Sequence, residues 1–291
     1  MTKAKVLLQL DVDPQASSFD AFVAIDAGVD HLLQYPNVSR ENVIPLIHGA
    51  IFTRGPADLK NTALFFGGSE AGAAESLYHV ARQNFFGPLL VSLMCDPNGA
   101  NTTAAAAVLS IEKHLPLNGV NLVVLGGTGP VGSRVARLAA SQGAVVRICS
   151  RSLERARATA ESIQKAHPQA RVEPFEFLAE ADVARAAAGF DVLVAAGAAG
   201  ATFTLPDWLD HVPGIRLAVD LNAVPPVGLI GIDPRDEGEL RSGLICYGAL
   251  GVGGLKMKIH KACLKQLFES NERCFNTSEI FEFGRFLANN A

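Results

Sequence analysis

Residues 120–139 read VNLVVLGGTGPVGSRVARLA, and the fold of this chain can be worked out from that stretch. Its first six residues form a short apolar run, which is typical of a buried strand. The glycines that follow have the spacing GxGxxG at Gly127, Gly129 and Gly132. Apolar residues then recur at i, i+4, i+7 and i+8, which predicts a helix with one apolar face: Val131, Val135, Leu138 and Ala139. A strand, a glycine-rich loop and a helix in this order predict a loop that binds the phosphates of a dinucleotide.

Each glycine of this loop has a separate physical role. Gly127 permits the tight turn, Gly129 lets the backbone approach a pyrophosphate, and Gly132 lets the helix pack closely on the strand. A proline at the first helical turn loses no intrahelical hydrogen bond, and the free N–H groups there attract an anion. The residues predicted to contact the cofactor are Gly127, Thr128, Gly129, Pro130, Val131 and Gly132. The alternative, a glycine-rich turn without a ligand, is less favoured by the strand–loop–helix context.

The end of the next expected strand indicates which dinucleotide is bound. Ser150, Arg151 and Arg155 follow that strand, where NAD-binding proteins usually carry an acidic residue. A carboxylate would repel the 2′-phosphate of NADP, whereas hydroxyl and guanidinium groups hydrogen-bond it, so we expect NADP. The alternative is that the two arginines are solvated residues at a helix start. The ends of two later strands supply further candidates for ribose and nicotinamide contacts, or else simple turns: Ala196, Gly197 and Asn222.

Composition restricts the class of protein. The chain has 291 residues, 49% of them hydrophobic and 19% charged, which is enough apolar material for two folded domains. Its net charge of −4 argues against a nucleic-acid partner, because phosphate binding needs a basic surface. No apolar run approaches the ~20 residues of a membrane span, and the first residues do not form a signal peptide. Five scattered cysteines without a CxxC pair, and the lack of a histidine motif, predict a cytoplasmic protein with free thiols and no metal.

Apolar runs and helical periods alternate along the chain. Strands are expected at residues 5–10, 62–66, 89–95, 120–125, 144–149, 172–177, 191–196 and 215–221. Helices lie between most of them, including one capped by Ser152. This alternation predicts an α/β protein, with a Rossmann-like, doubly wound parallel sheet and a smaller N-terminal α/β domain. Pro116 to Gly119 forms a turn, so we expect a substrate domain at 1–115 and a nucleotide domain at 116–269.

Several longer segments resemble one enzyme family. They are Phe19-Asp20, Ile51–Arg54, Phe86–Pro88, Asp96–Thr103, Gly127–Gly132, Asp220–Pro226 and Gly248–His260. Through them the chain resembles, end to end, the methylene-tetrahydromethanopterin/methylene-tetrahydrofolate dehydrogenases of methylotrophic bacteria, and most closely their NADP-dependent branch. The resemblance implies that a methylene-pterin is oxidised to the methenyl form while hydride passes to NADP⁺. It also implies a pterin pocket between the two domains, C-terminal helices at about 270–291 that pack back on the first domain, and a trimer-based homo-oligomer.

The chemistry of this reaction restricts the kind of catalytic residue to look for. Hydride leaves a carbon flanked by two nitrogens whose lone pairs stabilise the resulting cation, so no general base is required. A negative or dipolar environment near the forming cation would help. Asp20 is a candidate for that role, unless it is an ordinary carboxylate near a helix start. Lys256, which the resemblance favours as functional, would contact a pterin carbonyl; the alternative is that Lys256 or Lys258 is a solvated helix residue.

The polar segment after the strand at 89–95 supplies candidate substrate ligands. Asn98, Thr102 and Thr103 could hydrogen-bond the pterin or the nicotinamide, although capping of the following helix accounts for at least one of them. Both pterin carriers remain candidate substrates, because they share the reacting core. The lysine motif of the folate dehydrogenase/cyclohydrolases is not evident, so no cyclohydrolase activity is expected.

Two other functions stay open at this point. One is an NADP-dependent reductase of shikimate dehydrogenase-like architecture, which would need a Lys–Asp pair at matching motifs that this chain lacks. The other is a non-catalytic module that senses NADP. Such a module would not need the polar segment Asp96–Thr103.

Overall fold

The computed structural model describes residues 3–290, which form two compact units. Unit 1 contains the chain up to Thr102 and again from Met257, and unit 2 contains residues 103–256. The divisions fall inside two helices, α4 (Ala100–Glu112) and α8 (Ala249–Gln266). The bounds expected from the sequence were 115/116, from the turn residues, and 269/270, from the family resemblance. A helix that runs through a division keeps one continuous period, so its sequence holds no local sign that the chain changes units.

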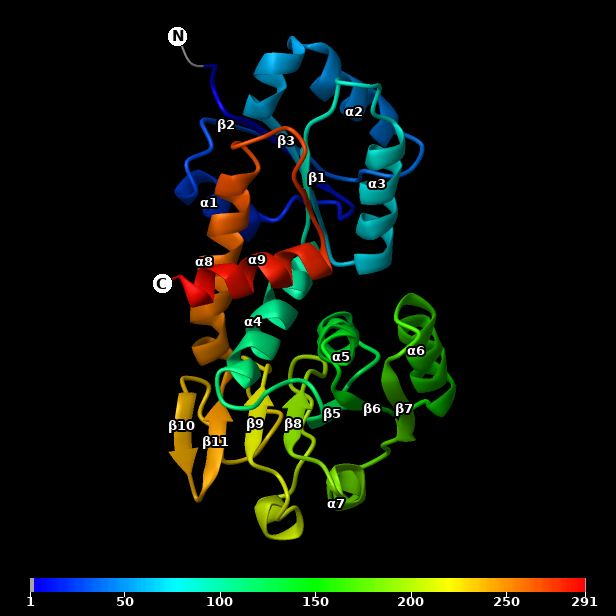
Figure 1. Cartoon of the computed structure of the whole chain (residues 1–291), viewed down its shortest axis with the longest axis vertical. Helices are drawn as coiled ribbons and strands as arrows, with labels where there is room; N and C mark the ends of the chain where they lie inside the picture. Colours follow the sequence, from blue (N-terminus) through cyan, green and yellow to red (C-terminus); the bar gives the residue numbers. More distant parts are fainter. Residues whose placement is uncertain (1–2, 291) are drawn as a thin grey trace. The chain divides into compact units, whose positions relative to one another are not determined.

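Unit 1 is built on a five-stranded parallel sheet with the strand order β12-β4-β3-β1-β2, of which Figure 1 labels β1, β2 and β3. Its strands are β1 (Val6–Asp11), β2 (His31–Tyr35), β3 (Thr62–Gly67), β4 (Ser92–Cys95) and β12 (Cys274–Phe275). Counted in chain order, the arrangement is 2-1-3-4-5, so the order of strands reverses between β1 and β3. Ligands of open α/β sheets bind outside the carboxyl ends of the strands at such a point, which here are Asp11 and Gly67.

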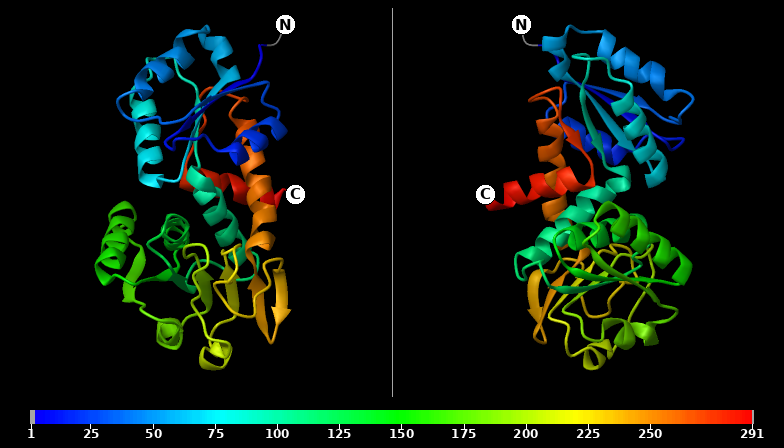
Figure 2. Two further views of the ribbon diagram at one scale, coloured as in Figure 1. Left: turned by 180° about the vertical axis from the view of Figure 1, so that it is seen from behind. Right: turned by 45° about the vertical axis from the view of Figure 1, so that its right-hand side comes forward.

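Helices cover both faces of this sheet (Figures 1 and 2). The helices α2 (Val43–Phe52) and α3 (Ala71–Gln83) lie on one face, whereas α1 (Ser18–Asp26) and residues 257–266 of α8 lie on the other. The last helix of unit 1 is α9 (Thr277–Asn289). Alternate strand residues meet α2 and α3 in an apolar core: Leu8, Leu10, Leu64, Phe66, Leu93, Ile47, Leu77 and Tyr78. The opposite face of the strands is more polar and buries Gln9, Asp11 and Ser92.

Unit 2 contains a seven-stranded sheet with the order β10-β11-β9-β8-β5-β6-β7. Its strands are β5 (Asn121–Leu125), β6 (Val145–Ser150), β7 (Arg171–Glu176), β8 (Val192–Ala195), β9 (Leu217–Asp220), β10 (Glu237–Arg241) and β11 (Leu244–Tyr247). All pairs are parallel except the hairpin β10–β11. From β7 to β11 the order is 3-2-1-4-5-6, which is that of dinucleotide-binding sheets, with the reversal between β5 and β8. The predicted Rossmann-like, doubly wound sheet is confirmed.

Both faces of the unit 2 sheet are covered. The helices α5 (Pro130–Ser141) and α6 (Leu153–Ala166) lie on one face, and α7 (Val183–Ala187) and the 3-10 helix Trp208–His211 lie on the other (Figures 1 and 2). The second face buries a core that includes Val123, Leu125, Phe190, Leu193 and Trp208. Strands buried on both sides need apolar residues at nearly every position, which explains a mean hydropathy of +0.23.

The eight strands expected from the sequence are present within a few residues, and the missed strands and α-helices are β2, β10, β11, β12, α2 and α7. β2 is an edge strand that is largely exposed, so its residues do not alternate between apolar and polar. The hairpin β10–β11 turns at Ser242 and Gly243, both with positive φ (49° and 82°), and its first strand is polar. No helix among residues 3–290 is long and apolar enough to cross a membrane.

Candidate active site

The glycine-rich loop of unit 2 connects β5 to α5 at the reversal point of the sheet. Gly127 donates its N–H to the carbonyl of Cys149 (3.0 Å), and Gly129 donates to the carbonyl of Gly126 (3.0 Å). These bonds fold the loop over the ends of β5 and β6. Gly126 has a φ of +71°, a conformation that glycine adopts without strain. Pro130 is the first residue of α5, as expected.

The glycines are needed because the loop packs closely. A Cβ atom on Gly132 would lie 2.5 Å from the carbonyl oxygen of Gly126, and one on Gly126 would lie 2.8 Å from the Cα of Gly197. The remaining predicted loop contacts, Thr128, Gly129 and Val131, are partly exposed. A pyrophosphate fits this arrangement, because the first N–H groups of a helix have no intrahelical acceptor and the helix dipole attracts an anion.

Side chains at the end of β6 are joined to the same loop. Ser150 is buried; its Oγ lies 3.3 Å from Thr128 Oγ1 and accepts the N–H of Ser152 (3.2 Å). Ser152 caps α6 by accepting the N–H of Arg155 (3.2 Å), as predicted. Arg151 and Arg155 are exposed at this end of the helix. The end of β6 therefore carries two hydroxyl groups and two cations beside the loop.

The end of β8 packs against the glycine-rich loop. The carbonyl oxygen of Ala196 lies 2.9 Å from the position of a Cβ on Gly126, and the ring of Phe203 crowds Gly197. Ala196 also donates its N–H to the carbonyl of Leu125 (2.9 Å). These backbone contacts bring the predicted residues Ala196 and Gly197 into one cluster with the loop.

Asp220 and Asn222 organise the loop after β9. The buried Asp220 carboxylate accepts the N–H of Asn222 (3.0 Å) and of Leu229 (2.9 Å). The side-chain amide of Asn222 donates to the carbonyl of Pro226 (3.0 Å) and accepts the N–H of Val224 (3.1 Å). Burial raises the pKa of the Asp220 carboxyl, and hydrogen bonds from backbone N–H groups offset part of that effect. The Asn222 side chain thus holds its own loop, which is the turn arrangement left open from the sequence.

In unit 1, buried carboxylates meet at the reversal point between β1 and β3. Asp11 is fully buried and accepts the N–H of Asp13 and of Ser17 (3.0 Å each). Asp20 is 5% exposed and lies in the first turn of α1, which Ser17 caps. A Cβ on Gly67 would lie 3.4 Å from Asp11 Oδ2 and 3.7 Å from Asp20 Oδ2. Two buried carboxylates, one of them the predicted Asp20, therefore flank Gly67.

Another buried carboxylate, Asp96, folds the polar segment after β4. Its Oδ1 accepts the N–H groups of Asn101 (2.9 Å) and Thr102 (3.0 Å), and its Oδ2 accepts the Thr102 hydroxyl (2.6 Å). Asn98 is exposed between them in the left-handed conformation, with a φ of +50°. Thr103 is partly exposed in the first turn of α4. Thr102 is fully buried in the same turn, where its hydroxyl donates to the Asp96 carboxylate that caps the helix.

The two lysines considered in α8 differ in exposure. Lys256 is 8% exposed, whereas Lys258 is exposed to solvent. Lysine is almost never buried to this extent unless its charge is compensated, so burial distinguishes the predicted residue from its neighbour. His260 follows Lys256 by one turn of the same helix and is fully buried.

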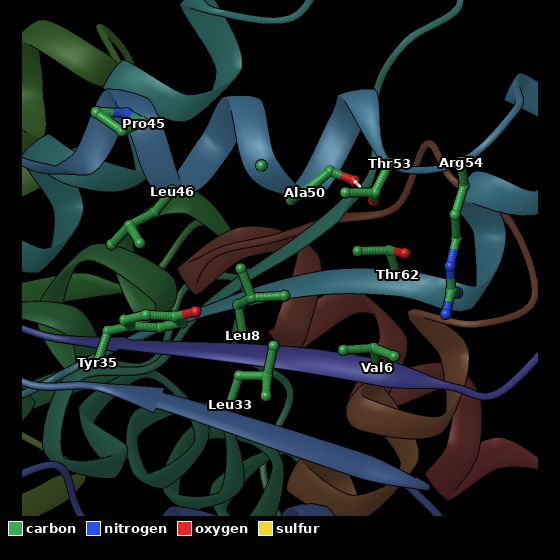
Figure 3. A pocket seen from close by; sticks show the side chains of 11 residues that line it. Val6, Leu8, Leu33, Tyr35, Pro45, Leu46, Ala50, Thr53, Arg54 and Thr62 are labelled. Atoms are coloured by element: carbon green, nitrogen blue, oxygen red, sulfur yellow. Dashed lines mark hydrogen bonds between the residues drawn. The ribbon is translucent and has the colours of Figure 1, made fainter.

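A cavity of about 310 Å³ beneath α2 is separate from these residues (Figure 3). Val6 and Thr62, the first residues of β1 and β3, help to line it, so it reaches the amino ends of those strands. Figure 3 shows Arg54 at one end of a lining that is otherwise largely apolar. None of the described lining residues is among those predicted to bind a ligand.

Residues 18–98 match the family model of the N-terminal domain of methylene-tetrahydromethanopterin dehydrogenase. The chain is also 41% identical over 286 residues to the bifunctional protein MdtA of Methylorubrum extorquens, an alignment that covers 98% of this chain and 99% of that one. The chain belongs to the methylene-tetrahydromethanopterin dehydrogenase family. Another relative, the NAD(P)-dependent methylenetetrahydromethanopterin dehydrogenase of the same organism, is 30% identical over 264 residues and is covered to 89%. The family resemblance inferred from the motifs is confirmed.

Solved structures share the fold of this dehydrogenase family member. Shikimate 5-dehydrogenase from Listeria monocytogenes, in complex with shikimate and NAD, aligns with a TM-score of 0.56 and 14% identity over 96% of both chains. Quinate dehydrogenase from Corynebacterium glutamicum, in complex with NAD, aligns with a TM-score of 0.51 and 18% identity over 98% of this chain and all of that one. At such identities the likeness shows the fold alone.

Some residues that organise the site of this dehydrogenase family member were not predicted. Asp11, Asp96 and Asp220 lie at or directly after the ends of β1, β4 and β9. An aspartate at the carboxyl end of an apolar run is the signal that could have identified them. Arg134 is buried in α5 and donates to the carbonyl of Pro130 (2.7 Å), an arrangement that no motif indicated.

Proposed function

We propose that this protein oxidises methylene-tetrahydromethanopterin to the methenyl form with NADP⁺ as the hydride acceptor, and that it also accepts methylene-tetrahydrofolate. The observation that carries the proposal is the match to the dehydrogenase family along nearly the whole chain. One of these relatives is named for this activity with NAD(P). The protein is accordingly an oxidoreductase of one-carbon metabolism.

The residues around the glycine-rich loop support NADP as the cofactor. The loop and the start of α5 suit the pyrophosphate, while hydroxyl and guanidinium groups after β6 suit the 2′-phosphate: Thr128, Ser150, Arg151 and Arg155. When bound, NADP⁺ supplies the carbon that accepts the hydride. Ala196, Gly197 and Asn222 support the nucleotide site through the backbone of their loops.

The reaction asks the protein for orientation and for charge stabilisation rather than for proton transfer. We assign the Asp20 carboxylate to the side of the pterin on which positive charge develops. Its burial beside Asp11 supports this role, because a charge shielded from water acts more strongly on its neighbours. The ammonium group of Lys256 would oppose a forming cation, so it is assigned to a pterin carbonyl oxygen, where it donates a charge-assisted hydrogen bond.

The segment after β4 is proposed to bind the pterin ring. Asn98 is exposed there and offers both an amide donor and an amide acceptor, and Thr103 is a second candidate for contact. Thr102 is proposed to support this segment without touching the pterin, since it donates its hydroxyl to the buried Asp96. The left-handed backbone at Asn98 supports a functional role, because such conformations persist where the surrounding structure holds them.

A direct assay tests the proposed function. The protein is mixed with methylene-tetrahydromethanopterin or methylene-tetrahydrofolate and with NADP⁺ or NAD⁺, and the absorbance bands of NADPH and of the methenyl product are followed. We expect both bands to grow together with NADP⁺ and more slowly with NAD⁺. Shikimate and quinate serve as control substrates, because they belong to enzymes that share the fold. Absence of turnover with either pterin, or turnover of shikimate, would refute the proposal.

Compartment and assembly complete the proposal. The five cysteines are free thiols, which supports a reducing compartment, and we propose the cytoplasm. We also propose a trimer-based homo-oligomer. Sedimentation velocity of the purified protein tests the assembly, and a monomer at micromolar concentration would contradict it.

A further inference from the structure

His260 lies where elements that carry proposed pterin residues meet. It is fully buried in the part of α8 that belongs to unit 1. Its Nδ1 lies 3.5 Å from Asp96 Oδ2, and its ring stacks on Phe65 of β3, with centroids 5.8 Å apart and planes 13° apart. The ring of Phe19 in α1 lies 6.5 Å away. One side chain thus contacts the Asp96 segment, the central strand β3 and the start of α1.

The contact of His260 with Asp96 involves the carboxylate oxygen that accepts no backbone N–H group. Asp96 Oδ1 accepts two backbone N–H groups, whereas Oδ2 accepts the Thr102 hydroxyl and faces His260. A buried carboxylate needs such polar neighbours, because water is absent. By accepting the N–H groups of Asn101 and Thr102, the same carboxylate joins the two ends of the short segment that contains Asn98, a residue in the left-handed conformation. Loss of the imidazole should therefore let Asn98 move from its present position.

The contact with Phe19 reaches a second proposed residue. Phe19 directly precedes Asp20 in the first turn of α1, and its ring is tilted by 55° against that of His260. The imidazole therefore packs against the first turn of α1, the turn that carries Asp20. Because His260 is fully buried, it affects the pterin through these two segments rather than by touching it.

We propose that His260 is a positioning residue of the pterin site, which holds Asn98 and Asp20 in place through Asp96 and Phe19. This inference rests on the proposed function. It goes beyond that function because a hydride transfer without a general base gives no reason for a histidine–aspartate pair beside the site. The proposal assigns the pair to geometry and not to proton transfer.

Two substitutions at this position separate the ring from its nitrogen. His260→Phe keeps the stack on Phe65 but removes the nitrogen near Asp96. His260→Asn removes the ring but keeps an amide nitrogen where Nδ1 was. We expect His260→Phe to raise the KM for methylene-tetrahydromethanopterin about tenfold, which corresponds to about 1.4 kcal/mol of lost pterin binding. The dissociation constant of NADPH, measured by fluorescence titration, should stay within about twofold, because unit 2 is unchanged. His260→Asn should recover part of the loss.

His48→Phe is the matched control, since His48 also lies in unit 1 in contact with aromatic rings, those of Phe52 and Phe86. It should leave both constants unchanged. If His260→Phe does not fold, Phe65→Leu removes the ring beneath His260 and should give the same separation of the two constants. A pterin KM within twofold of the wild type, or equal losses for pterin and NADPH, would overturn the inference. An inactive wild type would instead refute the proposed function, so the two failures are distinguishable.

Discussion

The helix α5 begins so close to its loop that a Cβ atom on Gly132 would lie 2.5 Å from the carbonyl oxygen of Gly126. Gly132→Ala should therefore push the helix away from the loop, at a cost of about 1–3 kcal/mol in the free energy of unfolding. NADPH affinity should fall with it. Urea unfolding and fluorescence titration measure the two effects. Gly72→Ala in α3 is the control, because nothing lies within 4 Å of a Cβ there, and it should leave both unchanged or stabilise slightly.

The cations after β6 predict a change of cofactor preference. Arg151→Asp should raise the KM for NADP⁺ by about tenfold to a hundredfold, because a guanidinium that binds the 2′-phosphate is replaced by a group that repels it. The KM for NAD⁺, which lacks that phosphate, should change little. Arg157→Asp makes the same change of charge at another exposed position of α6 and should affect both cofactors weakly. Equal losses for NADP⁺ and NAD⁺ in Arg151→Asp would contradict the assignment.

The buried carboxylate in the first turn of α1 predicts a loss of rate. Asp20→Asn should lower kcat by about a hundredfold, the usual order when one preorganised electrostatic contact to a transition state is removed. NADPH binding should be unaffected. Steady-state kinetics at saturating pterin gives the comparison. The control is Asp26→Asn, at the exposed end of the same helix, where the carboxylate forms an ion pair with Lys261. If both variants keep full kcat, Asp20 has only a structural role.

The raised pKa of Asp220 predicts a specific dependence of stability on pH. Between its ordinary value of 3.8 and the raised value, the folded protein binds more protons at this site than the unfolded chain does. The contribution of Asp220 to the free energy of unfolding therefore falls as pH rises through that window. Asp220→Asn lacks this contribution. Urea unfolding at several pH values should show the variant gaining relative to the wild type as pH rises, and a gain in the opposite direction would contradict the burial effect.

The cysteines predict a simple pattern of reactivity. Burial raises the pKa of the Cys149 thiol to about 12, and Cys95, Cys246 and Cys263 are buried as well. Only the thiolate reacts, so a thiol reagent at pH 8 should modify Cys274, which is partly exposed, before any other. All five should react after unfolding. Peptide mapping of the modified protein identifies the labelled residue, and rapid labelling of Cys149 in the folded protein would contradict the prediction.

The glycine-rich loop of unit 2 and the elements on either side of it could be predicted because their information is local. A strand, a glycine-rich loop and a helix follow one another within residues 120–139. The conformation of each residue there depends on neighbours only a few positions away in the sequence. The capping of α6 by Ser152 is equally local and was also predicted. The edge elements β2 and β10 escaped prediction because solvent on one side removes the need for an apolar pattern.

The candidate pterin residues of unit 1 depend on contacts with residues that are distant in the chain. Asn101 accepts the hydroxyl of Thr277, 176 positions away, and Asp96 faces His260. No spacing in the sequence relates such residues, so Thr102 could be named as a ligand or as a cap but not assigned. The difference between Lys256 and Lys258 is likewise a matter of burial, which only the packing of α8 decides.

The two-residue strand β12 affects the order in which the two units can fold during synthesis. It completes the unit 1 sheet beside β4, where Leu93 donates its N–H to the carbonyl of Arg273 (2.7 Å) and Ser92 its hydroxyl to Ser270 (2.8 Å). During synthesis, residues 103–256 leave the ribosome before β12 does and can fold while β4 still has an open edge. Unit 1 is finished only when the last residues emerge. A ribosome that stops before β12 would therefore release a chain with a complete unit 2 and an unpaired strand edge at β4, which is a template for aggregation.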